Sequence, residues 1–302
     1  MKRIYLFLLC LYPIFMAGQN NLYVSRSGSD QNDGSSPENA LRSIAKAVEK
    51  VTPGTTVYIM PGNYDSGDSW DPVINLPKTK SGEKGKEIIF RAYDPNNRPV
   101  LTSKGKGRWQ CIDIQASYIV IDGLELVGGN QDFTEADSIA AYKLSKDSHD
   151  KVSGFDWNEA AKYNTNGLSI GKGGSGGGFP HHVTVRNCKV HDFPGSGISA
   201  QQADYITFEN NEVYNNAWYT LYACSGISIL TPYDCDDNTD FKMFITGNTV
   251  YNNHTKIPWA STSNFRYSDG NGIIADINRK PDGGSTQEIK DKGAYKGKTL
   301  IA

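Results

Sequence analysis

The segment 197–216, GISAQQADYITFENNEVYNN, decides the fold of this chain. It opens with a short Gly-apolar-polar-apolar strand and closes with a second strand that ends in asparagine turns. Apolar residues alternate with polar ones in both strands, and this period of two indicates β-strands rather than helices.

The same unit recurs along the chain. Opening strands begin at Gly167, Gly226 and Gly272, and closing strands cover 185–192 and 245–252. Self-similarity at such spacings is typical of solenoids. Strands of this kind, stacked in register, predict an all-β parallel β-helix with one continuous apolar column inside.

Asparagines recur at the same phase of the unit, in the pairs 210–211, 215–216 and 252–253. Asparagine tolerates the left-handed backbone region, and its amide can form hydrogen-bonded ladders between coils. We therefore expect sharp turns and ladders at these positions; the alternative is that they are ordinary loop asparagines.

The N-terminus predicts export. A basic Met1-Lys2-Arg3 precedes an apolar run from Ile4 to Ala17 that is too short for a membrane span. Residues 1–18 are therefore interpreted as a signal peptide, and the mature protein is expected to be secreted, periplasmic or on the cell surface, without a membrane span. The net charge is −2, and acidic and basic residues are interspersed along the chain. This pattern does not indicate a nucleic-acid-binding surface.

Four cysteines follow the signal segment. Cys224 and Cys235 flank one strand closely enough to pair in an exported protein, whereas Cys111 and Cys188 are expected to be core residues.

Residues 19–56 are expected to cover the open end of a β-helix that spans 57–302. Leu41, Ile44, Ala45 and Val48 show helical spacing, with Ser36 as the expected N-cap and Pro37 at the first helical position. The sequence thus predicts a short strand and one capping helix before the first coil.

This opening resembles a known group. The matching segments are Tyr23-Val24-Ser25, Gly28-Ser29-Asp30, Asn32-Asp33-Gly34, Pro37, Val57-Tyr58-Ile59 and Pro61-Gly62-x-Tyr64. They are similar to the start of secreted bacterial right-handed parallel β-helix proteins of the pectate-lyase-like superfamily. The resemblance implies a right-handed helix with an N-terminal capping helix, and a secreted polysaccharide-degrading enzyme. It specifies the fold strongly and the substrate weakly, because the superfamily holds lyases, glycosidases and proteins without assigned activity.

Between Gly128 and Asn166 a polar insertion interrupts the repeat, with a short helix expected around Asn158–Lys162. Insertions in solenoids bulge from one face, which is often the binding face. Residues 298–302 start a strand whose turn does not follow, so we expect further coils beyond Ala302.

Acidic loops are the candidate metal site. Asp236 and Asp237 follow one strand, and Asp269 and Asp276 come one coil later. If these loops stack, their oxygens favour Ca²⁺, which takes six to eight such ligands; the alternative is that they are solvated turns.

A calcium ion there would suit a lyase that removes the proton α to a uronate carboxylate and expels the C4 oxygen. Lys256 and Arg266, with Asp269, are the candidate catalytic residues, and Arg279 and Lys280 are further cations nearby. The expected partner is an extracellular acidic polysaccharide, bound by a monomer.

Two other functions stay open. A glycoside hydrolase would use Asp236, Asp237 and Asp269 as acid and base, and a glycan-binding adhesin would use no catalytic group. Loop aromatics such as Trp218 and Tyr219 suit sugar stacking, although core packing explains them equally well.

Overall fold

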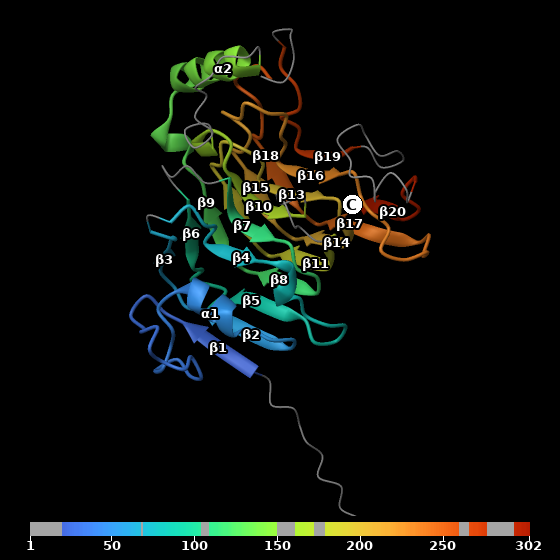
Figure 1. The fold of residues 1–302 in the computed structure, drawn as a ribbon. Helices are drawn as coiled ribbons and strands as arrows, with labels where there is room; N and C mark the ends of the chain where they lie inside the picture. The colour runs from blue at the N-terminus through green and yellow to red at the C-terminus, as the bar shows by residue number, and fades with distance from the viewer. Residues whose placement is uncertain are drawn as a thin grey trace, which may run out of the picture.

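The computed structural model describes residues 20–67, 69–103, 109–149, 161–171, 179–259, 266–276 and 293–302. Its described strands form three parallel sheets, and in each sheet the strands of successive coils stack along one axis (Figure 1). Sheet A holds β1 (Asn20–Val24), β2 (Thr55–Ile59), β5 (Ile88–Ala92), β8 (Ile119–Asp122), β11 (His181–Arg186), β14 (Asp204–Glu209), β17 (Phe241–Thr246) and β20 (Lys298–Ile301). Sheet B holds β3 (Asn63–Tyr64), β6 (Val100–Thr102), β9 (Glu125–Val127), β12 (Lys189–His191), β15 (Glu212–Tyr214) and β18 (Thr249–Tyr251). Sheet C holds β4 (Ile74–Leu76), β7 (Gln110–Ile114), β10 (Asn166–Ile170), β13 (Ile198–Gln201), β16 (Ile227–Leu230) and β19 (Ile273–Asp276).

From β2 on, the chain passes from sheet A to sheet B to sheet C in each coil, and the strands of neighbouring coils pair in parallel. The predicted parallel β-helix is therefore confirmed.

Alternation along each strand builds the core. Val183 and Val185 of β11 pair with Ile119 and Ile121 of β8, and all four side chains are fully buried. The same pattern recurs along the solenoid up to β17, so one apolar cluster extends from Leu22 to Ile245. Hydrophobic burial of this kind is the main stabilising term of the fold.

The cysteines follow the prediction in part. Cys111 and Cys188 are buried in the core cluster, as expected. The pairing that the sequence left open for Cys224 and Cys235 does not form, because both thiols are free. Strand β16 lies between the two residues, and its extended backbone holds them at opposite ends.

The asparagine turns are confirmed. Asn210, Asn215 and Asn252 have φ of 53°, 56° and 52°, which is the left-handed region. Beside them, Asn211 Nδ2 donates to Asn248 Oδ1 at 2.9 Å and Asn216 Nδ2 donates to Asn253 Oδ1 at 3.0 Å. These ladders satisfy buried backbone groups from one coil to the next.

The N-terminal helix α1 (Ile44–Lys50) forms, but its start differs from the prediction. Ser43 is the N-cap and accepts from Lys46 N, whereas Ser36 belongs to a turn that Asn39 closes. Strand β1 pairs with β2, so the chain enters sheet A before the helix. Ile44 is buried in the core, and a capping role for α1 stays a prediction.

The polar insertion contains a helix at a different place from the one expected. Helix α2 (Glu135–His149) rises beside the solenoid (green, top of Figure 1), whereas most of the expected Asn158–Lys162 helix lies outside the described residues. Tyr142 of α2 packs with Leu221 and Ile257, which are fully buried. The insertion is thereby held against two later loops between sheets B and C.

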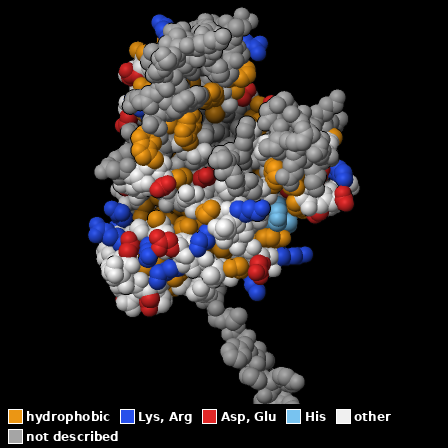
Figure 2. Space-filling view, viewed as in Figure 1, with side chains coloured by type: hydrophobic (Ala, Val, Ile, Leu, Met, Phe, Trp, Pro, Cys, Tyr) orange, Lys and Arg blue, Asp and Glu red, His pale blue; other side chains and the backbone are white. Residues whose placement is uncertain are grey.

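Residues 1–19, with the expected signal peptide, lie outside the described part. Within that part, none of the helices has the length and apolar character needed to cross a bilayer. Acidic and basic side chains are interspersed on the described surface that Figure 2 shows.

Candidate functional site

The outer face of sheet C carries a row of polar side chains. Asn75, Asp113, Ser169, Ser199 and Ser228 occupy equivalent positions on successive strands, opposite to the core residues. The hydroxyls of Ser169 and Ser199 lie 3.3 Å apart. Loops leave both ends of these strands, so the row lies between two sets of loops, and Ser169 and Ser228 are buried there.

Asp113 is the titratable residue of this row, and the sequence reasoning missed it. Gln115 Nε2 donates to Asp113 Oδ1 at 2.8 Å, yet burial is the larger effect and raises the pKa of this carboxyl. A carboxyl group that holds its proton to higher pH is suited to act as an acid. The signal in the sequence is the alternation along 112–114, which places Asp113 on the outer face between the apolar residues Ile112 and Ile114.

The three predicted catalytic residues lie in one loop, between β18 and β19. Lys256 Nζ lies 3.4 Å from the centroid of the Trp218 ring and 5.5 Å from that of Tyr219. Burial lowers the pKa of Lys256, against a smaller opposing effect of Glu135. The next residue, Ile257, is fully buried against Tyr142 of α2, so the insertion fixes this part of the loop.

Asp269 lies near Lys256 along this loop, because Thr255 Oγ1 donates to the Ser268 carbonyl at 3.3 Å. The backbone of Asp269 is left-handed, with φ of 62°, and Gly270 N donates to Cys224 O at 2.7 Å. Partial burial raises the pKa of Asp269, and the negative charge of Asp276 raises this pKa further.

Arg266 has an exposed side chain in the same loop, and its carbonyl accepts from Trp259 N. Arg279 and Lys280 lie outside the described residues.

The loop after β16 forms an ionic cluster with β14 and β17, around a buried lysine of β17. Lys242 Nζ is completely buried and lies 3.1 Å from Asp204, 3.0 Å from Asp234 and 2.9 Å from Asp236. Tyr205 donates to Asp236 at 2.8 Å. The hydrogen bond to Lys242 lowers the pKa of Asp236 to about 2, and these contacts raise the pKa of Lys242 despite its burial.

The four predicted metal ligands do not form one cluster. Asp236 and Asp237 follow the carboxyl end of β16, whereas Asp269 precedes the amino end of the neighbouring strand β19, and Asp276 is the last residue of β19. Asp237 pairs with Lys296 at 2.7 Å. The four aspartates therefore lie at both ends of sheet C, and their role as ligands stays a prediction.

Within the described ranges, one group of side chains brings three ligand atoms within 4.8 Å of one another: Asp204, Cys235 and Asp236. The Lys242 ammonium already contacts two of these residues, and a thiol is a poor ligand for calcium. This cluster therefore suits an internal ammonium ion better than a calcium ion.

Comparison with known proteins agrees with this architecture. Residues 22–273 match the sequence model of a family described as "Pel9A-like, right handed beta helix region". The crystal structure of pectate lyase Pel9A superposes with a TM-score of 0.52 at 17% identity, over 85% of this chain and 59% of that one. At this identity the likeness concerns the fold.

Two curated proteins match shorter stretches. The uncharacterized protein YwoF of Bacillus subtilis is 35% identical over 133 residues, which are 42% of this chain and 26% of YwoF. Pectate lyase PEL9 of Emericella nidulans is 36% identical over 84 residues, or 28% of this chain and 18% of PEL9. The matched regions thus span less than two thirds of each of these three relatives.

Proposed function

Because the chain belongs to the Pel9A-like right-handed β-helix family, we propose that it degrades a uronate-containing polysaccharide, and that it does so by β-elimination. The family match and the pectate lyase relatives support a carbohydrate substrate. The expected partner is accordingly an extracellular acidic polysaccharide.

The observation that carries the proposal is the environment of Lys256. Its ammonium is partly buried against Trp218 and Tyr219, and burial lowers its pKa. A lysine of this kind has a larger neutral fraction near neutral pH, and a neutral amine can accept a proton. In the proposed reaction Lys256 Nζ takes the proton α to the carboxylate, and the C4–O bond breaks as the C4–C5 double bond forms.

The other residues of the loop have proposed roles in the same step. Arg266 is the proposed partner of the substrate carboxylate, and Asp269, whose pKa is raised, is the proposed proton donor to the leaving C4 oxygen. A calcium ion is a further part of the proposal, and when bound it would neutralise the uronate carboxylate. Because Asp269 lies at the opposite end of sheet C from Asp236, Asp237 and Asp276, these four candidate ligands could not all hold one ion.

A glycoside hydrolase is the second candidate, because Asp113 and Asp269 both have raised pKa values and a hydrolase needs a protonated carboxyl group. The two functions differ in their products. Both reactions create new reducing ends. Only elimination also gives an unsaturated sugar that absorbs ultraviolet light.

The experiment is to incubate the protein with pectic, alginate and ulvan-type polymers, with added calcium or with a chelator, and to measure ultraviolet absorbance and reducing ends in parallel. Absorbance that grows with reducing ends supports the lyase. Reducing ends alone move the assignment to a hydrolase, and neither signal favours a glycan-binding role. Loss of activity with chelator, restored by calcium, is expected if the metal is required.

The variant Lys256→Met tests the base directly, because methionine keeps much of the contact with Trp218. The rate is expected to fall by about 10²-fold or more. Lys162→Met is the matched control, since Lys162 Nζ also lies over an aromatic ring, 5.2 Å from the centroid of Tyr163. Equal activity of the wild type and Lys256→Met would exclude Lys256 as the base.

A further inference from the structure

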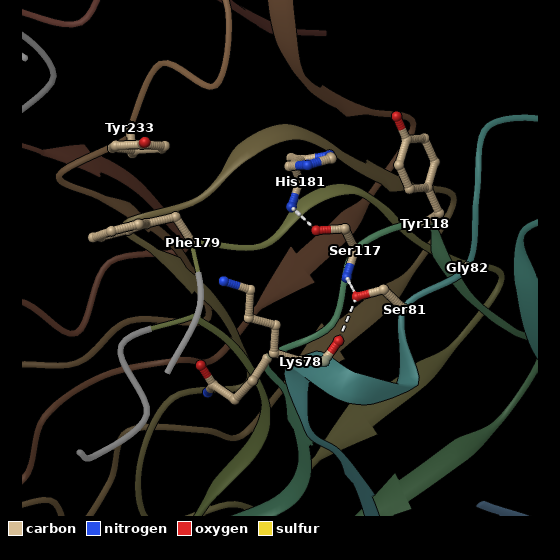
Figure 3. Close-up of a pocket in the computed structure, with 9 residues that line it drawn as sticks. Lys78, Ser81, Gly82, Ser117, Tyr118, Phe179, His181 and Tyr233 are labelled. Atoms are coloured by element: carbon tan, nitrogen blue, oxygen red, sulfur yellow. Dashed lines mark hydrogen bonds between the residues drawn. The ribbon is translucent and has the colours of Figure 1, made fainter. Parts of the chain in front are cut away.

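A cavity of about 390 Å³ opens where the chain leaves sheet C for sheet A. Figure 3 shows it between segments that follow β4, β7, β10 and β16, so side chains far apart in sequence meet there. Its volume lies within the range of ~300–1,000 Å³ that small-ligand sites have. In Figure 2 the surface over β8 and β11 carries a histidine side chain (pale blue) beside basic and hydrophobic ones.

One wall of the cavity is held by hydrogen bonds across three coils. Ser81 Oγ donates to Lys78 O at 2.8 Å, Ser117 N donates to Ser81 Oγ at 3.0 Å, and His181 N donates to Ser117 Oγ at 3.1 Å (Figure 3). This chain of bonds fixes the wall before any ligand arrives. A preformed wall reduces the entropy that binding must otherwise overcome.

The cavity offers a cation with no anion beside it. Figure 3 shows the Lys78 ammonium between Phe179 on one side and Ser117 and His181 on the other. Across the described chain, Lys78 forms no ion pair. Such an ammonium beside a cavity favours an anionic group of a ligand.

The cavity also offers a hydrogen-bond acceptor that no donor of the described residues satisfies. Gln115 is 8% exposed and lines the cavity, and its Nε2 donates to Asp113 Oδ1 and to the Gly171 carbonyl. Its Oε1 is buried, and none of the described residues donates a hydrogen bond to it. An unsatisfied buried acceptor is costly, and a ligand hydroxyl would satisfy it.

A pair of stacked rings completes the cavity. Phe179 and Tyr233 lie with ring centroids 4.3 Å apart and planes at 15° (Figure 3). The two residues come from different coils, so their stacking holds two loops together on this side. Flat aromatic surfaces of this kind pack against the apolar C–H face of a sugar ring.

We propose that this cavity binds one uronate unit of a polysaccharide, at the end of sheet C opposite to Lys256 and Asp269. The sugar carboxylate pairs with Lys78, a hydroxyl donates to Gln115 Oε1, and the ring face lies on Phe179. A neutral sugar would leave Lys78 unpaired, and a simple inorganic anion would leave both Gln115 and the ring face unused. The choice of a uronate rests on the proposed function, whereas the cavity itself does not.

The test measures binding by titration calorimetry, with trigalacturonate and triguluronate as probes and neutral galactotriose for comparison. One acidic probe is expected to bind at least about tenfold more tightly than galactotriose, because a charge-assisted bond is lost with the neutral sugar. Lys78→Met is expected to raise the Kd of that acidic probe about tenfold or more, and Phe179→Ala several-fold. Lys80→Met is the matched control, because Lys80 belongs to the same short helix (Lys78–Lys80) and its ammonium donates to Glu49 O instead.

Binding and catalysis are measured separately, so their failures can be told apart. If an acidic probe binds through Lys78 but no polymer is cleaved, the proposed function fails and the cavity assignment stands. The cavity assignment is overturned if neither acidic probe binds, or if Lys78→Met and Phe179→Ala, with unchanged circular dichroism, bind the probe like the wild type. It is also overturned if galactotriose binds as tightly as the acidic probes.

Discussion

Lys242 Nζ lies 3.1 Å from Asp204 Oδ2, and both side chains are completely buried. The pair joins β17 to the first residue of β14, and Asp204 also accepts from Cys235 N and from the Tyr295 hydroxyl. The Asp204 carboxylate thus holds together three parts of the chain: strand β17, the loop after β16 and the segment around Tyr295. The ionic cluster defines the position of this loop, which also carries Tyr233 of the proposed uronate cavity.

We expect Lys242→Met to lower the free energy of unfolding by about 3–5 kcal/mol, because Asp204 and Asp234 would be left buried without their cation. Urea denaturation followed by circular dichroism measures the change. Lys298→Met is the control: its ion pair with Asp240 is 3.8 Å long with both side chains exposed, and we expect a loss below about 1 kcal/mol. Equal losses in the two variants would contradict a structural role for the buried cluster.

Acid is expected to weaken the same cluster through Asp236. Its pKa in the folded protein is about 2, below the ordinary value of 3.8, so ionised Asp236 favours the folded state. This stabilisation is complete above the ordinary pKa and is lost as the pH falls through about 4 towards about 2. The measurement is the free energy of unfolding against pH for the wild type and Asp236→Asn. Their difference should shrink at low pH; a constant difference would show that Asp236 titrates normally.

The asparagine ladder gives a third prediction. Asn216 is fully buried, its Oδ1 accepts from Phe193 N, and its Nδ2 donates to Val190 O. Asn216→Ala leaves these two backbone groups unpaired, and we expect a loss of about 2–4 kcal/mol in urea denaturation. Asn75→Ala, on the exposed outer face of β4, should change stability by less than about 0.5 kcal/mol.

The repeat predicted the fold well because its physical causes are local in each coil. Alternation in segments such as 204–209 sets which side chains enter the core, and asparagines such as Asn210 supply the left-handed turn residue. The start of α1 was wrong because Ser36 and Ser43 are both good N-caps, and the choice depends on the packing of Ile44 in the core.

The site was harder to predict because loops leave both ends of the strands of sheet C. The sequence does not show at which end of the sheet a given loop residue lies. Asp236 and Asp269 were expected to lie on the same face of stacked loops. Instead, Asp236 follows strand β16 of sheet C, whereas Asp269 precedes strand β19. The sequence does not indicate the buried position of Lys242, because a lysine in a strand normally faces solvent. Lys78, Gln115 and Phe179 lie in three different coils, and sequence spacing did not indicate that they meet.

The last prediction concerns the protonation of Lys256, which can be measured without substrate. Burial against Trp218 lowers the pKa of Lys256, so its amine should titrate below the ordinary lysine value of about 10.4. NMR titration of the lysine side chains, with the Lys256 signal assigned from its absence in Lys256→Arg, measures this value directly. If Lys256 is the base, kcat/KM rises with pH and levels off at the pKa that NMR reports, since the free enzyme must hold the neutral amine. Lys256→Arg, which stays charged, should lose that limb and most of the activity. A Lys256 signal at or above about 10.4 would remove the physical basis for its proposed role, and a rate limb at a different pH would assign the base to another residue.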